Sequence, residues 1–243
     1  MHETAQHSAV SDALTAFAVG SPGTSAGPAL DAARARLAHA QAQRADTAVA
    51  PQLAALLQSQ GSSAEDLRVR AWTLGATLAK AAMRPDVPVL ATVVTVGNAI
   101  GASETAMAEA VAIGTEAAAR LVAAVDSAEF RARWNVASAI GLLGALLAAA
   151  RLYGLDATRA RHALGVAATQ AAGLAHNQQN AMGALETGKA AADAIEAALI
   201  AKHGFTSAPA SIDGRRGFAA LMAYRFDAGA VIDGIGTRWV SVD

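Results

Sequence analysis

The chain has 243 residues, 53% hydrophobic but only 4% aromatic, and this alanine-rich composition is typical of closely packed helices and predicts an all-α fold. Nineteen basic and twenty acidic residues give a net charge of −1, which argues against nucleic acid and anionic membranes as partners. The absence of cysteine excludes disulfides, thiolate nucleophiles and thiolate metal sites, and it fits a cytoplasmic protein.

Helix caps and breakers divide the first half of the chain. The cluster Gly20-Ser21-Pro22-Gly23 ends a first helix, and Ser62-Ser63-Ala64-Glu65 has the pattern of a capping box. The segment Arg84-Pro85-Asp86-Val87-Pro88 interrupts the helix that follows, while Gly101 and Ser103 match a C-cap and an N-cap. We therefore predict helices over residues 11–19, 29–43, 51–60, 62 to beyond 72, 89–100 and 103–125.

The second half is centred on the apolar run 136–150. This run is too short to span a membrane and is apolar on nearly every side, so it predicts a buried central helix surrounded by others and ending at Gly154. After residue 207 the segments become short, and only this end of the chain suits strands. Further predicted helices cover residues 156–173, 186–203 and 218–224.

The predicted domain organisation has a single large body. Residues 1–10 are expected to form a flexible N-terminus, and they lack the pattern of a secretory signal. Residues 11–235 are expected to form one multi-helix domain, followed by a C-terminal tail over 236–243.

Common chemical motifs are missing from the sequence. It contains no H-E-x-x-H pair and no G-x-S-x-G elbow, so we predict neither a metal nor a serine hydrolase of that type. The segment Gly141-Leu142-Leu143-Gly144 lies within an apolar run, where glycine favours close helix packing over phosphate binding. No organic cofactor is predicted either.

A series of short motifs resembles the helical domain of the MmgE/PrpD family, in one order and with compatible spacing from about Asp12 to Tyr224. That family includes 2-methylcitrate dehydratase, cis-aconitate decarboxylase and iminodisuccinate epimerase. The motifs are Gly101-Ala102-Ser103, Gly144-Ala145, Ala150 to Ala157, His162 to Ala167, Gln170 to Gly173, Gly188 to Ala191 and Gly204-Phe205-Thr206.

The resemblance implies a large helical domain, a smaller α/β domain and a homodimer built through the helices. Because the chain ends near the point where the second domain begins in relatives, we expect a single-domain version in which the small α/β domain is absent. Its pocket is then expected to be open, or completed by another subunit or another protein.

The chain departs from the family pattern at the first group of catalytic positions. Relatives carry an aspartate and a threonine ahead of a histidine-proline pair. This sequence has Leu74, then Thr77 or Leu78, then Arg84-Pro85. The family histidine is therefore replaced by Arg84.

The later catalytic positions are also changed. A second family histidine maps by spacing to Asn135, beside Trp134. The lysine and histidine ahead of Gly188-Lys189 map to Gly183 and Glu186. Every acid or base that the resemblance places at the site is altered, which implies a pocket less positive than in relatives.

We predict a site built from this remodelled wall. Glu186 is the candidate acid or base, with His176 and Arg84 as further candidate catalytic residues; Arg84 either holds a carboxylate or pairs with Asp86 or Glu186. Asn135 and Asn180 are expected to orient a carbonyl or hydroxyl. The candidate substrate-binding residues are Asn135, Trp134, Asn177, Gln178, Asn180 and Asp86.

Each candidate also has a structural interpretation. Glu186 near a helix start is a favourable dipole partner, and His176 after a helix can cap its carbonyls. The segment Asn177 to Asn180 can be an ordinary polar turn, and Trp134 can belong to the core. Lys189 and Asp193 have the spacing of an exposed helical ion pair.

Three functions remain open from the sequence. The first is a cofactor-independent lyase or isomerase acting by proton transfer on a small polar metabolite less anionic than citrate. The second is a binding protein that kept the pocket without the chemistry. The third is a helical subunit whose partner completes the site.

Overall fold

The computed structural model describes residues 8–45 and 51–242, which contain helices and no strand. The predicted all-α fold is confirmed. The α-helices are α1 Ala9–Val19, α2 Gly27–Ala45, α3 Pro51–Ser59, α4 Leu67–Ala81, α5 Asp86–Ile100, α6 Glu104–Val125, α7 Ala128–Arg133, α8 Val136–Ala139, α9 Gly141–Leu152, α10 Ala157–Gln170, α11 Ala181–Lys202, α12 Phe218–Met222 and α13 Ala228–Ile232. The 3-10 helices are η1 Thr24–Ala26, η2 Ala175–Gln179 and η3 Val240–Val242.

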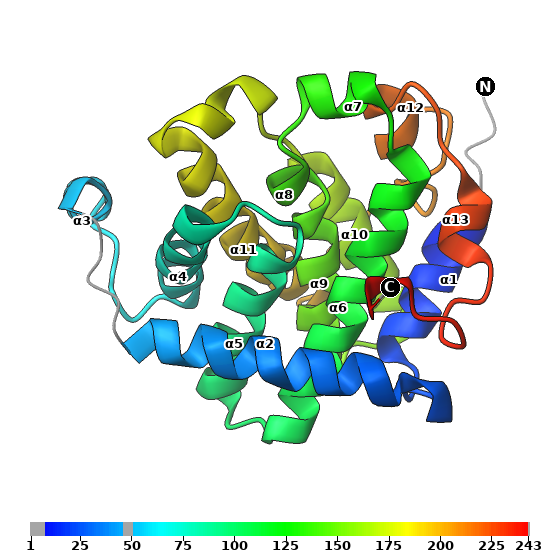
Figure 1. Ribbon diagram of the computed structural model, residues 1–243, viewed down its shortest axis with the longest axis horizontal. Helices are drawn as coiled ribbons and strands as arrows, with labels where there is room; N and C mark the ends of the chain where they lie inside the picture. The colour runs from blue at the N-terminus through cyan, green and yellow to red at the C-terminus, as the bar shows by residue number, and fades with distance from the viewer. Residues whose placement is uncertain (1–7, 46–50, 243) are drawn as a thin grey trace.

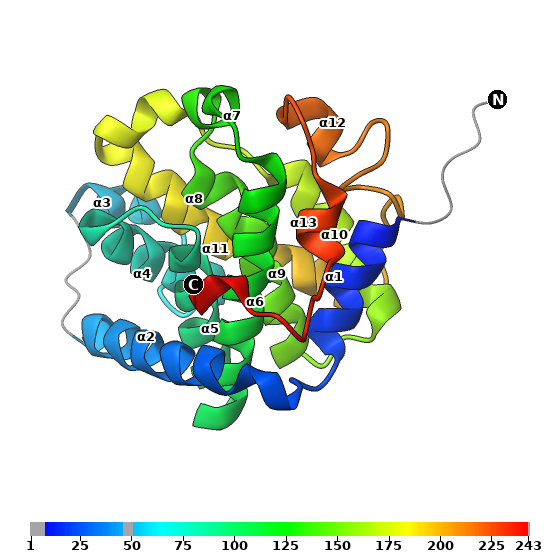
Figure 2. The ribbon, with the colours of Figure 1, turned by 45° about the vertical axis from the view of Figure 1, so that its right-hand side comes forward.

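Helix α9 forms the centre of the fold. It packs against α5, α6, α10 and α11, and every residue from Gly141 to Ala150 is buried. Figures 1 and 2 show it in the middle of the bundle, with α1 and α11 on opposite sides. The prediction of a buried central helix is confirmed, although the run is split at Ile140 into α8 and α9. The split lies beside Gly141, where a side chain would meet the carbonyl oxygen of Pro85.

Two helix crossings depend on glycine. A Cβ at Gly144 on α9 would lie 2.4 Å from the carbonyl oxygen of Gly114 on α6. A Cβ at Gly188 on α11 would lie 2.4 Å from backbone atoms of α4. The packing role predicted for Gly144 is therefore confirmed, and small residues let these helices approach closely.

Several helix ends were predicted correctly and others were not. Ser103 and Asp156 cap α6 and α10, and Gly101 ends α5 with a left-handed conformation. The capping-box prediction at 62–65 was wrong, because Asp66 caps α4 and accepts a hydrogen bond from the Arg68 amide. The start of α11 was also placed too late, because Asn180 is its N-cap.

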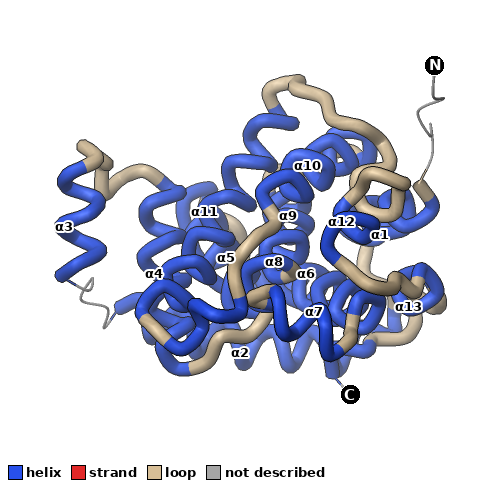
Figure 3. The backbone as a smooth tube through the Cα atoms, turned by 90° about the horizontal axis from the view of Figure 1, so that it is seen from above, coloured by secondary structure: helices blue, strands red, loops and turns tan. Residues whose placement is uncertain are grey.

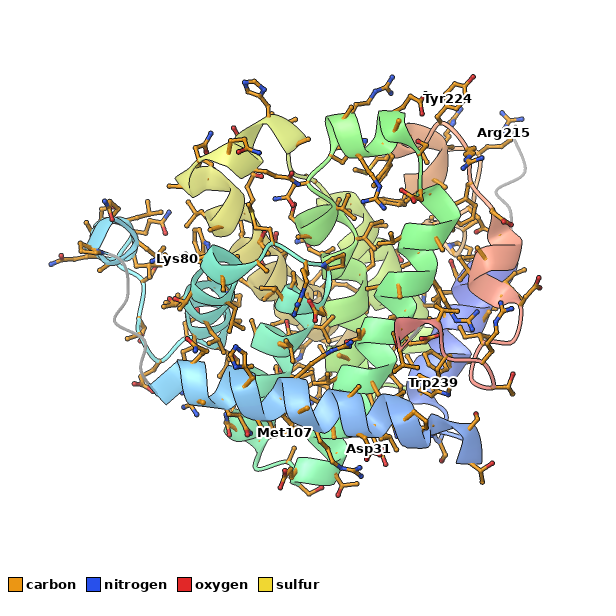
Figure 4. All side chains as sticks on the ribbon, in the orientation of Figure 1. Asp31, Lys80, Met107, Arg215, Tyr224 and Trp239 are labelled. Carbon is orange, nitrogen blue, oxygen red and sulfur yellow. The ribbon has the colours of Figure 1, made fainter. Side chains whose placement is uncertain are left out.

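The ends of the described chain are packed into the fold. Ser8 caps α1 and Val10 is buried, while residues 1–7 lie outside the described residues, so the flexible N-terminus over 1–10 stays a prediction. In the predicted tail, Trp239 is buried edge-on against Phe17, with ring centroids 5.5 Å apart. Figure 4 shows Trp239 inside the outline of the molecule. Residue 243 also lies outside the described residues.

A buried ion pair on α6 holds this C-terminal segment. Arg120 Nε donates to Glu116 Oε1 at 2.7 Å, and both side chains are fully buried. The Arg120 guanidinium also donates to backbone carbonyls between Ala230 and Arg238. Glu116 in turn accepts the amides of Val240 and Ser241 at 3.0 and 2.9 Å. No described helix is long and apolar enough to cross a membrane.

The ion pair of Lys189 and Asp193 differs from the exposed pair that was expected. Both carboxylate oxygens of Asp193 accept from Lys189 Nζ, at 2.6 and 2.7 Å, but the Asp193 side chain is only 14% exposed. Burial raises the pKa of Asp193 above its ordinary 3.8, against the opposing effect of Lys189. Ionised Asp193 therefore disfavours folding.

We expect Asp193→Asn to raise the melting temperature at about pH 7 and to change it little at about pH 3. A carboxyl group whose pKa is raised by folding contributes most stability below 3.8 and loses that contribution as pH rises through the raised value. Thermal unfolding of both proteins across this pH range tests the expectation. A destabilised variant at neutral pH would show that the Lys189 pairing outweighs burial.

Candidate active site

The predicted amide residues meet where η2, α8 and the start of α11 come together, in the upper part of Figure 1. Asn135 precedes α8 and is fully buried. Its Oδ1 accepts from Gln178 Nε2 at 3.2 Å. Its Nδ2 lies 3.5 Å from both the Gly183 carbonyl oxygen and Thr187 Oγ1, at the long limit for hydrogen bonds.

Glu186 belongs to the same group of side chains, the Asn135 cluster, which also contains Asn135, Asn177 and Gln178. Because α11 begins at Ala181, Glu186 lies beyond the first helical turn, where the effect of the helix dipole has fallen off. Its Oε1 accepts from Asn177 Nδ2 at 2.8 Å. Its Oε2 is buried and has no hydrogen-bond partner within the described residues. The carboxylate is therefore held at one oxygen and unsatisfied at the other.

Gly183 allows η2 to lie against α11. A Cβ at this position would come within 2.7 Å of Gln178 Cα and 2.9 Å of Met83 Sδ. The lysine that the family resemblance places here would therefore collide with η2 in its present position. Glycine in place of that lysine leaves space for Asn177 and Gln178.

Arg84 and Asp86 form a separate pair at the start of α5. Arg84 Nε and Nη2 donate to the two Asp86 oxygens at 3.0 and 3.1 Å. Arg36 Nε lies 4.0 Å from the same carboxylate. Of the alternatives left open by the sequence, Arg84 adopts the pairing with Asp86. No hydrogen bond or ion pair in the described ranges joins either residue to the Asn135 cluster.

The remaining candidates have structural contacts or none. Trp134 Nε1 donates to the Met222 carbonyl oxygen at 3.0 Å, and Trp134 forms an isolated β-bridge with Leu174. Asn180 caps α11 by accepting the Met182 amide at 3.0 Å. The His176 side chain is exposed on η2 and makes no side-chain hydrogen bond or ion pair with another described residue. These three residues fix or border the cluster without entering it.

Thr187 is a member of the cluster that was not predicted. It is fully buried, and its Oγ1 donates to the Gly183 carbonyl oxygen at 2.8 Å. Its position four residues after Gly183 places both on one face of a helix, which is the sequence signal that could have identified it.

Two cavities lie elsewhere in the molecule. One of about 640 Å³ borders α3, and one of about 580 Å³ lies beside the ion pair of Glu109 and Arg151. None of the predicted site residues lines either cavity. Among the described residues, no group of three or more histidine or acidic side chains is arranged to hold a metal ion.

Comparison with known proteins gives independent information on ancestry. Residues 46–229 match the MmgE/PrpD N-terminal domain. Cis-aconitate decarboxylase of Homo sapiens is 32% identical over 112 residues. That alignment covers 46% of this chain but only 23% of the decarboxylase.

Proposed function

The chain belongs to the MmgE/PrpD family, and from this premise we propose that it is a lyase or isomerase acting by proton transfer without a cofactor. The observation that carries the proposal is the Glu186 carboxylate. Asn177 holds Oε1, while the buried Oε2 lacks a partner among the described residues. An oriented carboxylate with one unsatisfied oxygen is suited to take a proton from a carbon acid.

Asn135 is the proposed electrophilic partner. Its Nδ2 makes only long contacts, so this donor is available for a substrate carbonyl or carboxylate oxygen on which charge develops. Glu186 Oε2 therefore removes the proton from the substrate carbon, and Asn135 Nδ2 stabilises the charge that develops on the substrate oxygen. In an isomerase the protonated Glu186 returns that proton to a carbon of the substrate, whereas in a dehydrating lyase it gives the proton to the departing hydroxyl group, which leaves as water.

Substrate entry requires η2 to move, because Glu186 Oε2 is shut off from solvent. The bonds from Asn177 to Glu186 and from Gln178 to Asn135 tie η2 to the two functional side chains. Displacement of η2 would free both side chains at once. We therefore propose that η2 opens as a lid and that substrate replaces its two amide contacts.

The proposed substrate class is a small carboxylate with an acidic C–H bond. The decarboxylase named above acts, by its name, on cis-aconitate, which makes that compound a rational member of the test set. Arg84 is already paired with Asp86, so the candidate site offers less positive charge than a tricarboxylate requires. We expect mono- or dicarboxylates to be preferred.

The first test compares Glu186→Gln with the native protein on a panel of small carboxylic acids in D2O. We expect the native protein to promote deuterium exchange or conversion of at least one acid, detected by NMR, and the variant to be slower by about 100-fold or more. Retained turnover would remove Glu186 from the mechanism.

Glu129→Gln provides the matched control. Glu129 is an exposed carboxylate on α7, and its loss should leave both the rate and the melting temperature unchanged. Both variants should unfold within a few degrees of the native protein, so that a lost rate reports chemistry.

A second candidate is a subunit whose site is completed by a partner. Trp134 pairs with Leu174 and donates to the Met222 carbonyl oxygen, and the apolar side chains of Leu174, Leu221 and Tyr224 are 56–79% exposed. Such a group favours an interaction surface. If the native protein binds an acid without converting it and a co-purified subunit restores turnover, this candidate replaces the first.

A further inference from the structure

A groove of about 640 Å³ lies between α3 and the helix bundle. Its walls come from the end of α2, α3, the turn before α4, the first half of α4 and the second half of α5. Figures 1 and 3 show α3 standing apart from α4 at one edge of the molecule. The volume lies within the range of about 300–1,000 Å³ typical of small-molecule sites.

The floor of the groove is mainly apolar and well covered. Leu57, Leu74 and Thr95 line it and are each less than 9% exposed. Leu57 belongs to a small hydrophobic cluster with Leu53 and Ala76 that holds α3 to α4. Hydrocarbon placed on this floor would remove mainly its own apolar surface from water, because the floor is already nearly covered.

The charged side chains that line the groove are basic within the described part of the chain. Arg44 and Arg70 contribute guanidinium groups, and no described acidic side chain lines the groove. Arg70 Nε donates to the Ala64 carbonyl oxygen at 3.1 Å, and its Nη2 pairs with Glu65. The Glu65 side chain is 82% exposed, so this pair is largely solvated. A ligand anion can compete with Glu65 for Arg70 at little cost.

The groove is distinct from the Asn135 cluster, although it includes Leu74, which stands where the resemblance places a family aspartate. The groove and the predicted site both include residues of α5, but Asp86 lies in the first turn of that helix, whereas Thr95 and Asn98 lie in its second half. At 1.5 Å per residue, Asp86 and Asn98 are about 18 Å apart along the helix axis. The Asn135 cluster contributes nothing to the groove.

We propose that this groove binds a small amphipathic anion. Its carboxylate is held by Arg44 and Arg70, and its aliphatic body lies over Leu57 and Leu74. Guanidinium groups match carboxylate geometry, and the apolar floor selects hydrocarbon over a fully polar anion. The short helix α3 would close over the aliphatic body.

Octanoate is the probe for this proposal, with octylamine, octanol and inorganic phosphate as comparisons. In NMR titrations we expect octanoate to bind saturably and at least about tenfold more tightly than each comparison compound. Backbone amide shifts should cluster on α3, the start of α4 and the end of α5. Equal binding of octylamine, shifts centred on another region, or no saturation below about 10 mM octanoate would overturn the proposal.

Charge variants identify the head-group contacts. Arg44→Gln and Arg70→Gln should each weaken octanoate binding by about tenfold, which corresponds to about 1.4 kcal/mol. Glu65→Gln should tighten it, because Arg70 is released from its competing carboxylate. Arg34→Gln is the matched control, since Arg34 lies on α2 outside the groove and pairs with Asp31. If Arg44→Gln, Arg70→Gln and Glu65→Gln all bind octanoate like the native protein, the assignment fails.

Discussion

Replacing Arg120 with methionine is expected to lower the free energy of unfolding by about 3–5 kcal/mol. The substitution leaves Glu116 as a fully buried carboxylate without its cation, and removing one member of a buried pair costs far more than the pair itself contributes. It also removes the donors for backbone carbonyls from Ala230 to Arg238. The C-terminal segment should therefore detach before the rest of the protein unfolds.

Urea denaturation and limited proteolysis measure the two effects of Arg120→Met. We expect a lower denaturation midpoint and earlier cleavage after residue 228. The control is Arg131→Met, because Arg131 pairs with Asp126 on the surface and such pairs contribute about 0–1 kcal/mol. Equal losses in the two variants would contradict a special role for the buried pair.

Gly188→Ala is expected to destabilise the protein by about 3 kcal/mol or more. The new methyl group would lie 2.4 Å from both the Ala76 amide nitrogen and the Trp72 carbonyl oxygen. These are backbone atoms, so relief requires α4 and α11 to separate, and overpacking of this kind commonly costs about 1–3 kcal/mol even where side chains can yield. Separation would also displace Glu186 and Thr187 on α11.

Gly27→Ala is the control for the helix crossing. Nothing lies within 4 Å of a Cβ at Gly27, and its helical position should accept alanine with no loss or a gain of up to about 1 kcal/mol. Denaturant unfolding of the two variants gives the comparison. A Gly188→Ala protein as stable as Gly27→Ala would show that the crossing tolerates a wider spacing.

Local sequence signals predicted most of the helices because they act within a turn or two of the residues that carry them. Ser103 and Asp156 cap their helices through amides three residues ahead, and Gly101 supplies a left-handed conformation at its own position. Local signals could not decide whether Ser63 or Asp66 caps α4. Both offer oxygens to nearby amides, and only Asp66 also pairs with Arg68.

The sequence predicted which residues belong to the candidate site, but not which of them contact one another. The sequence motifs directed attention to Asn135, Asn177, Gln178 and Glu186, which the structure brings together. They also directed attention to Arg84 and Asp86, which pair with each other at the start of α5. A charge can take any of several partners, and the choice depends on distances set by helix packing.

The amino-acid sequence by itself determined the helical class, the buried central segment and the packing role of Gly144, because composition, periodicity and side-chain size act locally. Only the tertiary structure decided the rest. It brought Gln178 to Asn135 across 43 positions, and Arg120 to the carbonyl oxygen of Arg238 across 118. It also opened the groove beneath α3. Contacts between distant positions follow from how whole helices pack, so no local pattern could specify them.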